Sequence, residues 1–422
     1  MDILIKGGRL ICPKNNLDEV MDVFVRCGII APLIKSQMLP DIQIIDASGC
    51  WVVPGLIDMH VHLRDPGAPQ KETIETGAKA AAAGGFTTIC CMPNTNPVID
   101  SKKIVDYVKS KDPPINVLPV GSISRGLAGI ELSNIAEMKL AGICAISDDG
   151  KTIENPKLML DAFIEAAKHD LPVLAHCEDL RLVGSGQINE GKRQAELNLE
   201  PIPPEAEEII VARDIILARK ANAQLHICHI STARAVELVR QAKKDGQKVT
   251  AEVCPHHFSL TSDDIPGLDA NYKMSPALRD QKDKAAILEA LKDGTIEVIA
   301  TDHAPHAEDE KNNLFIDAPN GIIGLETAVP IAITELVNTD ILTPLQLIAK
   351  FASNPAAILN LNLGCLSVGK KADITIIDPR ASYFIDKHTF ASKSRNTPFH
   401  GKKVFGRVLY TIYGGNIVYS GR

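Results

Sequence analysis

Between about residues 55 and 355, eight short apolar runs rich in β-branched residues alternate with stretches rich in Ala, Lys and Glu. This alternation is typical of repeated βα units, whose strands lie parallel in one sheet. Eight such units in one stretch of the chain favour a closed TIM-like (β/α)8 barrel over an open sheet. The predicted strands end within residues 60–63, 90–93, 118–122, 145–149, 174–177, 227–230, 251–255 and 299–303.

The two ends of the chain differ in character from the middle. Both show alternating apolar patterns without long helical stretches, for example Ile3 and Ile5 near the N-terminus. Neither end is long enough to bury a core alone. We therefore expect a small β-sandwich domain built from residues 1–53 and 360–422, beside a catalytic barrel domain of residues 54–359.

The composition limits the classes of partner that the chain can bind. Its formal net charge is −7 with acidic and basic residues interspersed, so we expect neither nucleic acid nor a membrane as a partner. The N-terminus has no signal-peptide pattern, and no apolar run approaches the roughly 18 residues of a membrane helix. The ten cysteines include no CxxC pair, which is typical of buried thiols in a reducing compartment. A cytoplasmic protein that acts on a small molecule is expected.

Two histidines, His60 and His62, lie at the end of the first predicted barrel strand. Side chains at positions i and i+2 share one face of a strand, so both imidazoles can reach one metal ion. Other imidazoles and carboxylates stand at the ends of further predicted strands, where barrel enzymes carry out their chemistry. Four histidines and two carboxylates at one mouth suit a pair of zinc-like ions. The full set is His60, His62, Asp149, His176, His229 and Asp302.

Strand alternation leaves some neighbouring residues undecided. Asp148 and Asp149 face opposite ways, so only one of them enters the mouth, and the pattern does not say which. Asp58 shares the face of His60, where it is either a satisfied buried carboxylate or a group that orients a ligating imidazole. Positions in the barrel wall or in hydrogen bonds are expected for His226, His256 and His257.

Two long loops are expected at the mouth of the barrel, at residues 183–204 and 303–321. The first ends in a proline-rich stretch before a helix, and the second is polar and follows the last barrel strand. Long loops at this face are commonly functional lids, and the alternative is a disordered surface excursion.

Several motifs together resemble the dihydroorotases of the amidohydrolase superfamily, in their longer bacterial form. The HxH pair with a late aspartate marks the superfamily, whereas Arg64, Asn94 and His306 point to dihydroorotase itself. The resemblance covers nearly the whole chain. The motifs are HVHLRDPG at 60–67, GGFTT at 84–88, MPNTNP at 92–97, SDDG at 147–150, TDHAPH at 301–306 and KSRNTP at 393–398.

The resemblance implies a centre of one or two Zn²⁺ ions. Asp149 stands where many relatives use a carboxylated lysine to bridge the ions. Because aspartate is shorter, the resemblance leaves open whether both ions bind. The implied ligands are His60, His62 and Asp302 for the first ion, and His176 and His229 for the second.

The same resemblance implies the reversible cyclisation of N-carbamoyl-L-aspartate to L-dihydroorotate and water, the third step of pyrimidine synthesis. Asp302 would be the catalytic residue, which moves a proton between water and the ring nitrogen. Ser275 departs from the pattern, since relatives often carry Asn there, and a hydroxyl replaces only part of an amide's hydrogen bonding. A homodimer and an association with aspartate carbamoyltransferase are also implied. The implied substrate-binding residues are Arg64, Asn94, Ser275, His306 and Gly321.

Two other functions compete with this interpretation. Hydantoinases, dihydropyrimidinases and allantoinases share the barrel and the HxH pair, but they typically use a carboxylated lysine at the bridging position. A catalytically silent barrel could act only as a scaffold for aspartate carbamoyltransferase, but such relatives have lost ligands that this chain keeps. For Arg64 the alternative to substrate binding is an ion pair with Asp65.

Overall fold

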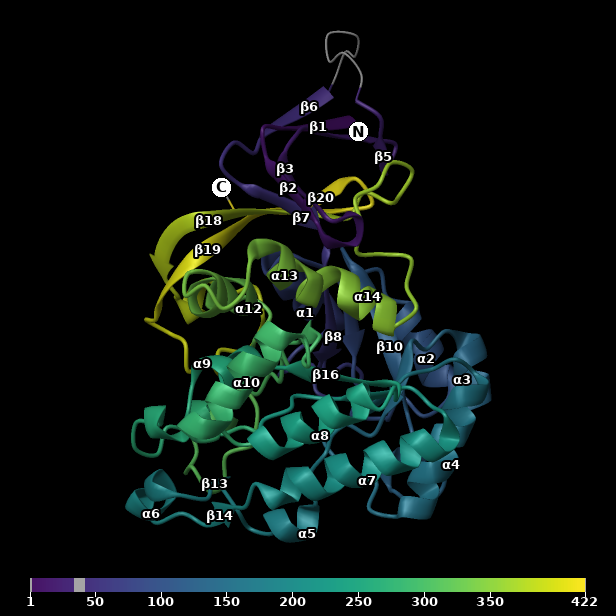
Figure 1. The fold of residues 1–422 in the computed structure, drawn as a ribbon, viewed down its shortest axis with the longest axis vertical. Coiled ribbons are helices and arrows are strands. Elements are labelled where there is room, and N and C mark those ends of the chain that lie inside the picture. The colour runs from purple at the N-terminus through teal and green to yellow at the C-terminus, as the bar shows by residue number, and fades with distance from the viewer. Residues whose placement is uncertain (1, 34–41, 422) are drawn as a thin grey trace.

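The middle of the chain folds into a closed parallel barrel in the computed structural model, which describes residues 2–33 and 42–421 (Figure 1). Its strands neighbour one another in chain order, and each neighbouring pair is parallel. A parallel bridge between Val61 and His303 joins the first strand to the segment after the last. The predicted (β/α)8 barrel is therefore confirmed. The strands are β8 (Leu56–Val61), β9 (Phe86–Cys91), β10 (Asn116–Ser122), β11 (Ala145–Ser147), β12 (Val173–Ala175), β15 (Leu225–Ile227), β16 (Val249–Val253) and β17 (Val298–Ile299).

Burial explains why these runs form barrel strands. Every residue of β8 and of β9 is buried, as expected for parallel strands that are covered on both faces. Each of the barrel strands ends within the range predicted from the sequence. The carboxyl ends therefore meet at one mouth, where the candidate ligands follow.

The outer helices begin at residues suited to cap them. Thr73 caps α1 (Ile74–Ala83) and Asn155 caps α4 (Pro156–Lys168), each by accepting hydrogen bonds from backbone N–H groups of the first turn. No helix in the described ranges is long and apolar enough to cross a membrane. The other outer helices are α2 (Lys102–Lys109), α3 (Ile135–Ala141), α7 (Glu205–Ala221), α8 (Ala233–Lys244), α10 (Gln281–Asp293), α12 (Ala328–Ala332), α13 (Pro344–Ile348) and α14 (Asn354–Ile358), with π-helical turns η6 (Ile333–Val337) and η7 (Ala349–Ser353) between the last three.

The two ends of the chain form two small sheets that pack on each other at one end of the barrel (Figure 1). One apolar core joins them, with Ile3 and Val25 from the first sheet and Val52 and Ile376 from the second. The predicted β-sandwich is thus confirmed, while the exact domain boundaries stay a prediction. The first sheet has the order β5 (Ile29–Ala31), β4 (Val23–Arg26), β1 (Asp2–Lys6), β6 (Ile42–Asp46), and the second β20 (Asn416–Ser420), β19 (Lys403–Tyr413), β18 (Ile374–Phe384), β7 (Trp51–Pro54), β2 (Arg9–Cys12), β3 (Leu17–Val20).

Both long loops carry short elements that the sequence did not predict. Loop 303–321 is held by two buried lysine side chains: Lys273 Nζ donates to Phe315 O at 2.8 Å, and Lys311 Nζ donates to Pro319 O at 2.9 Å. The short elements at the mouth are α5 (Leu180–Val183), β13 (Ile188–Asn189), α6 (Lys192–Leu197), β14 (Pro201–Ile202), α9 (Pro255–Ser259) and α11 (Glu308–Lys311); single 3-10 turns are η1 (Pro13–Asn15), η3 (Arg125–Leu127), η4 (Ser262–Asp264), η5 (Ala270–Tyr272) and η8 (Lys387–Thr389).

Candidate active site

All six predicted ligands converge at the carboxyl ends of the barrel strands, and all six are buried. His62 Nε2 lies 3.0 Å from Asp302 Oδ1, and His176 Nδ1 lies 2.9 Å from His229 Nε2. Two groups of three residues each bring their potential ligand atoms within 4.8 Å of one another. One group is His60, His62 and Asp302, and the other is His60, Asp149 and His229. The strand ends thus bring together the residues that the sequence predicted would meet.

Asp149 lies at the centre of this cluster. Its carboxylate oxygens are 3.3 Å from His60 Nε2, 3.3 Å from His62 Nε2, 3.6 Å from His176 Nδ1 and 3.4 Å from His229 Nε2. The neighbouring carboxylate of Asp148 turns away and accepts a 2.9 Å hydrogen bond from the backbone N–H of Ser124. The choice that strand alternation left open therefore falls on Asp149.

The cluster is an environment that favours cations. Burial opposes a charge on His176, but the nearby carboxylates of Asp149 and Glu178 outweigh burial and raise its pKa to about 10. Burial likewise opposes ionisation of Asp149, and the surrounding histidines nevertheless hold its pKa well below the usual range. His60 Nε2 and Asp149 Oδ1 have no hydrogen-bond partner among the described residues, although both are buried. Imidazole nitrogens and carboxylate oxygens in this arrangement fit a zinc-class ion.

Three further side chains orient the ligating imidazoles. His60 Nδ1 donates to Glu252 Oε1 at 2.7 Å, and His62 Nδ1 donates to Asn94 Oδ1 at 2.8 Å. His176 Nε2 donates to Glu178 Oε2 at 3.2 Å. These bonds fix the tautomer that leaves the other ring nitrogen facing the cluster, as partners of metal-bound histidines commonly do.

Sequence reasoning missed Glu178 and Glu252. Both are almost fully buried carboxylates. A usable signal existed for each: Glu178 follows His176 by two residues, and Glu252 lies inside the apolar strand β16. Glu252 Oε2 also accepts a 3.1 Å hydrogen bond from His226, which agrees with the wall position expected for that histidine.

Asp58 supports the backbone rather than an imidazole ring. It accepts hydrogen bonds from His60 N at 3.0 Å and from Thr301 Oγ1 at 2.6 Å. Of its two proposed roles, the satisfied buried carboxylate is the one found. The backbone that it holds is strained, because Asp302, the next residue after Thr301, has a φ of 47° in the left-handed region, as do His229 at 33° and Arg64 at 57°.

A pocket of about 240 Å³ opens onto the cluster and is lined by all five predicted substrate-binding residues. Arg64 does not pair with Asp65: its Nε donates to Pro305 O at 3.2 Å, and Asp65 instead accepts a 2.7 Å bond from Tyr107. Gly321 has a φ of 116°, and a Cβ there would lie 2.6 Å from the Cβ of Ala304, so glycine keeps this wall open. The lining residues are His62, Arg64, Asn94, Asp149, Gly150, His176, His229, Ser275, Asp302, Ala304, His306, Asn320 and Gly321.

Like Arg64, three other predicted substrate-binding residues make hydrogen bonds within the protein, and these are Asn94, Ser275 and His306. Asn94 uses its oxygen for His62, so its amide nitrogen is the group left for a ligand. Ser275 donates to Glu178, which ties it to the partner of His176. His306 Nε2 donates to Asn320 O at 2.8 Å, while burial and the charge of Arg64 lower its pKa to about 2. His306 is therefore a neutral imidazole at physiological pH.

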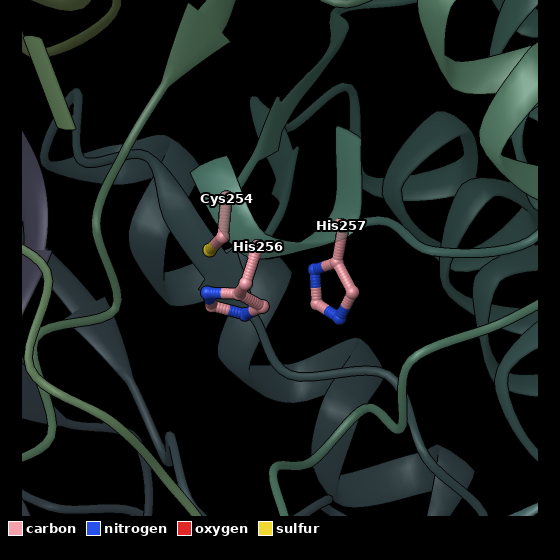
Figure 2. A group of neighbouring side chains, drawn as sticks. All are labelled: Cys254, His256 and His257. Atoms are coloured by element: carbon pink, nitrogen blue, oxygen red, sulfur yellow. The ribbon is translucent and has the colours of Figure 1, made fainter. Parts of the chain in front are cut away.

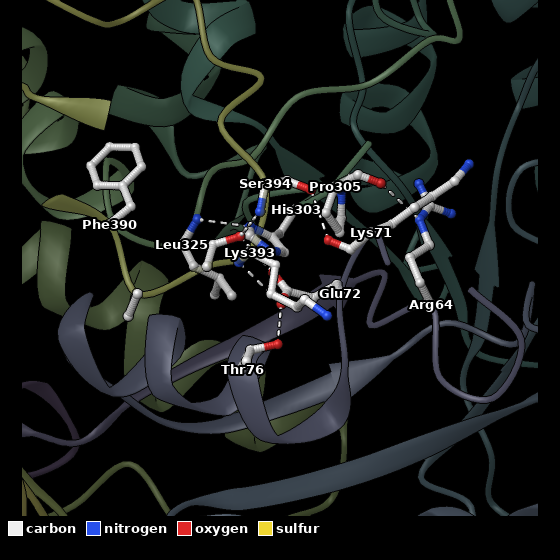
Figure 3. A network of polar contacts seen from close by, with 12 residues as sticks. Arg64, Lys71, Glu72, Thr76, His303, Pro305, Leu325, Phe390, Lys393 and Ser394 are labelled. Carbon is white, nitrogen blue, oxygen red and sulfur yellow. Dashed lines mark hydrogen bonds and ion pairs between the residues drawn. The ribbon is translucent and has the colours of Figure 1, made fainter. Parts of the chain in front are cut away.

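The C-terminal segment 390–398 reaches back to the barrel mouth and holds the backbone around Asp302. Glu72 accepts hydrogen bonds from Ser392 Oγ at 2.5 Å and from Thr76, and its Oε2 lies 3.4 Å from His303 Nε2 (Figure 3). His303 Nδ1 in turn accepts from Gly324 N at 3.2 Å. Figure 3 shows this network beside Arg64 and Pro305.

Asn396 fastens both ends of loop 303–321. Its Nδ2 donates to Ala304 O at 3.0 Å and to Gly321 O at 3.1 Å, and its Oδ1 accepts from His306 N at 3.2 Å. One buried amide thereby positions two predicted substrate-binding residues. Asn396 belongs to the KSRNTP motif, but the sequence did not reveal what it contacts.

Comparison with known proteins decides the family. A family model described as "Dihydro-orotase-like" matches residues 49–235. The dihydroorotase of Acetivibrio thermocellus is 49% identical over 419 residues, which cover 99% of this chain and 98% of that protein. The chain belongs to the dihydroorotase family. The dihydroorotase of Geotalea daltonii is likewise 49% identical, over 424 residues that cover 100% of both proteins.

Solved structures show how the dihydroorotase family relates to the competing amidohydrolases. The L-hydantoinase (dihydropyrimidinase) of Arthrobacter aurescens has a TM-score of 0.88 at 25% identity, covering 99% of this chain and 96% of that one. A D-hydantoinase structure has a TM-score of 0.86 at 25% identity, covering 100% and 95%. Both share the fold at a much lower identity than the dihydroorotases. The chain is thus a cyclic amidohydrolase, and the higher identity favours the dihydroorotase branch.

Proposed function

We propose that the barrel mouth catalyses the reversible cyclisation of N-carbamoyl-L-aspartate to L-dihydroorotate and water. The observation that carries this proposal is that one pocket holds both the histidine and aspartate cluster and the half-buried side chain of Arg64. The cluster suits hydrolysis of an amide, and the guanidinium suits a substrate carboxylate. Relatives named dihydroorotase, at 49% identity over the full chain, support the same reaction.

The proposed cofactor is Zn²⁺, with one or two ions per chain. Asp149 lies within 3.6 Å of all four histidines and would contact either ion. A bound ion of this class acidifies water and polarises an amide carbonyl. The ligands proposed are His60, His62 and Asp302 for one ion, and His176 and His229 for the other, with Asp149 between them.

Asp302 is the proposed proton carrier. Burial opposes its ionisation, but His60 and His62 outweigh burial and hold the pKa of this carboxyl below its usual range. The carboxyl group is therefore ionised at neutral pH, which is the form that a proton acceptor needs. In hydrolysis it takes the proton of the attacking water and passes it to the departing ring nitrogen, and in cyclisation it removes the ureido proton.

Arg64 is proposed to bind the substrate carboxylate. Its Nε is used by the Pro305 carbonyl and its Nη2 lies 3.5 Å from His306 Nε2, so a substrate anion would bind through Nη1 and compete for Nη2. His306 is uncharged, and because its Nε2 carries the proton, its unpartnered Nδ1 can only accept a hydrogen bond, as from a substrate N–H. The amide of Asn94 and the backbone at Gly321 complete the proposed contacts, and Ser275 acts through Glu178.

Substrate specificity tests the proposal. Metal-loaded protein should hydrolyse dihydroorotate and leave hydantoin, dihydrouracil and allantoin unchanged. Turnover of dihydrouracil but not of dihydroorotate would overturn it in favour of a dihydropyrimidinase. Arg64→Leu should raise KM for dihydroorotate strongly while the metal content stays that of the unmodified protein, and unchanged kinetics would refute the role of Arg64.

From the resemblance we further propose a cytoplasmic homodimer that associates with aspartate carbamoyltransferase. Sedimentation of the purified protein tests the dimer. Co-purification with the transferase from the native source tests the association.

A further inference from the structure

We propose that Cys254, His256 and His257 form a separate site for one Zn²⁺ ion. The thiol sulfur and one ring nitrogen from each histidine lie within 4.8 Å of one another. The three residues come from one short turn, in which Cys254 follows β16 and the two histidines begin α9. Figure 2 shows the sulfur beside the ring of His256, with His257 next to it.

Two imidazole nitrogens of this group are buried without a partner among the described residues. His256 is 2% exposed and His257 is 3% exposed, so solvent does not satisfy them. His256 Nε2 and His257 Nδ1 have no hydrogen-bond partner among the described residues. An unpaired buried polar group is unfavourable, because it has lost its hydrogen bonds to water and gained none in the protein. A metal ion bound by this group would satisfy ring nitrogens that the protein leaves unpaired.

The orientation of His257 also suits metal binding. Its Nε2 donates a 3.0 Å hydrogen bond to the carbonyl of Pro276, so the proton lies on that nitrogen. Nδ1 therefore carries a free lone pair. A ligating histidine commonly shows this arrangement, with one ring nitrogen bound to a carbonyl and the other bound to the metal. The sequence predicted wall or hydrogen-bonding positions for both histidines, and the bond to Pro276 accounts for only one of their four ring nitrogens.

The charge states of the three side chains also suit a metal ion. Burial lowers the pKa of His256 to about 4 and that of His257 well below its usual range, so both are neutral, as a ligand must be. Burial raises the pKa of the Cys254 thiol, so zinc binding must release this proton to solvent as the zinc–sulfur bond forms. One positive charge then remains, within the field of the Asp302 carboxylate. His60, His229 and Arg279 act on the two histidines in the opposite direction, and Arg279 has Glu207 3.5 Å away as its counter-ion.

A second thiol in the barrel needs to be distinguished from this one. Cys228 forms another group of potential ligands with His60 and Glu252. In that group His60 Nδ1 and Glu252 already bind each other at 2.7 Å, and the other carboxylate oxygen takes His226. The imidazole nitrogen and the carboxylate oxygens of the Cys228 group are therefore already hydrogen-bonded.

Cobalt substitution provides a test that does not depend on activity. A thiolate bound to Co²⁺ gives a near-ultraviolet charge-transfer band, whereas the histidine and aspartate cluster contains no sulfur. Metal-free protein titrated with Co²⁺ should develop this band and bind one ion more than Cys254→Ser does. The band should be lost in Cys254→Ser and kept in Cys228→Ser and in the control Cys144→Ser. No band in the unmodified protein, or a band that survives Cys254→Ser, would overturn the proposal.

A second measurement covers the case in which Cys254→Ser does not fold. X-ray absorption of zinc-loaded Cys228→Ser should show a sulfur neighbour at about 2.3 Å for one fraction of the bound zinc ions, namely those at the Cys254 site. Spectra with only nitrogen and oxygen neighbours would reject the site, whatever the variant's stability.

Discussion

Asn396→Ala should loosen loop 303–321 and weaken substrate binding without touching the metal cluster. The variant removes three hydrogen bonds, of 3.0, 3.1 and 3.2 Å, that hold Ala304, Gly321 and His306. At about 1 kcal/mol for each bond, the loop loses about 3 kcal/mol of local stability. If substrate binding must restore this order, KM rises by up to roughly 100-fold, since about 1.4 kcal/mol corresponds to tenfold.

The assay separates positioning from chemistry. We expect a higher KM for dihydroorotate, a smaller change in kcat, unchanged metal content, and faster hydrogen exchange in residues 303–321. Asn396→Asp should be at least as harmful, because its carboxylate faces two carbonyls without a proton to donate. The matched control is Asn354→Ala, which removes a 2.8 Å bond to the carbonyl of Glu297, a residue that does not line the pocket. Normal KM and normal loop exchange in Asn396→Ala would refute the reasoning.

Two further changes test the site and its surroundings. Glu252→Gln removes the charge that orients His60, so metal affinity should fall about 10–100-fold in chelator competition, and an unchanged affinity would deny Glu252 this role. Burial lowers the pKa of Lys311 to about 7 from its ordinary 10.5, so between these values the unfolded chain binds more protons than the folded one. In denaturant titrations the stability of the unmodified protein should therefore rise with pH relative to that of Lys311→Met, by up to about 1.4 kcal/mol per pH unit across that window. The comparison removes the contributions of Lys350, whose pKa is also lowered, and of the buried thiols, whose pKa values are raised. The same pH dependence in both proteins would show that Lys311 makes no such contribution.

The barrel was predictable because its signal is local and repeated. Each strand is recognisable in the sequence as a short run of apolar residues, as in Leu56–Val61. The ends of these strands determine which imidazoles and carboxylates can meet. Five of the six cluster residues followed from these positions, and the resemblance selected Asp149 as the sixth. Parity could not choose between Asp148 and Asp149, because the choice depends on Ser124, a partner on the neighbouring strand segment.

Contacts between distant segments were beyond the sequence. Asn396 lies 75 residues from Gly321 along the chain, and no periodicity connects the two. Glu252 reaches His60 only because the barrel closes. The short elements in residues 183–204 were missed because strands of two residues, such as Ile188–Asn189, are too short to show alternation.

The carboxylate at the centre of the cluster is encoded directly by the gene. A carboxylated lysine must first capture dissolved carbon dioxide on its amine before it can bridge two ions, so assembly of such a centre depends on the supply of that gas. Asp149 presents its oxygens to all four histidines as soon as the strands have closed. Metal uptake by the freshly folded chain should therefore proceed at the same rate in bicarbonate-free buffer as in buffer that contains it.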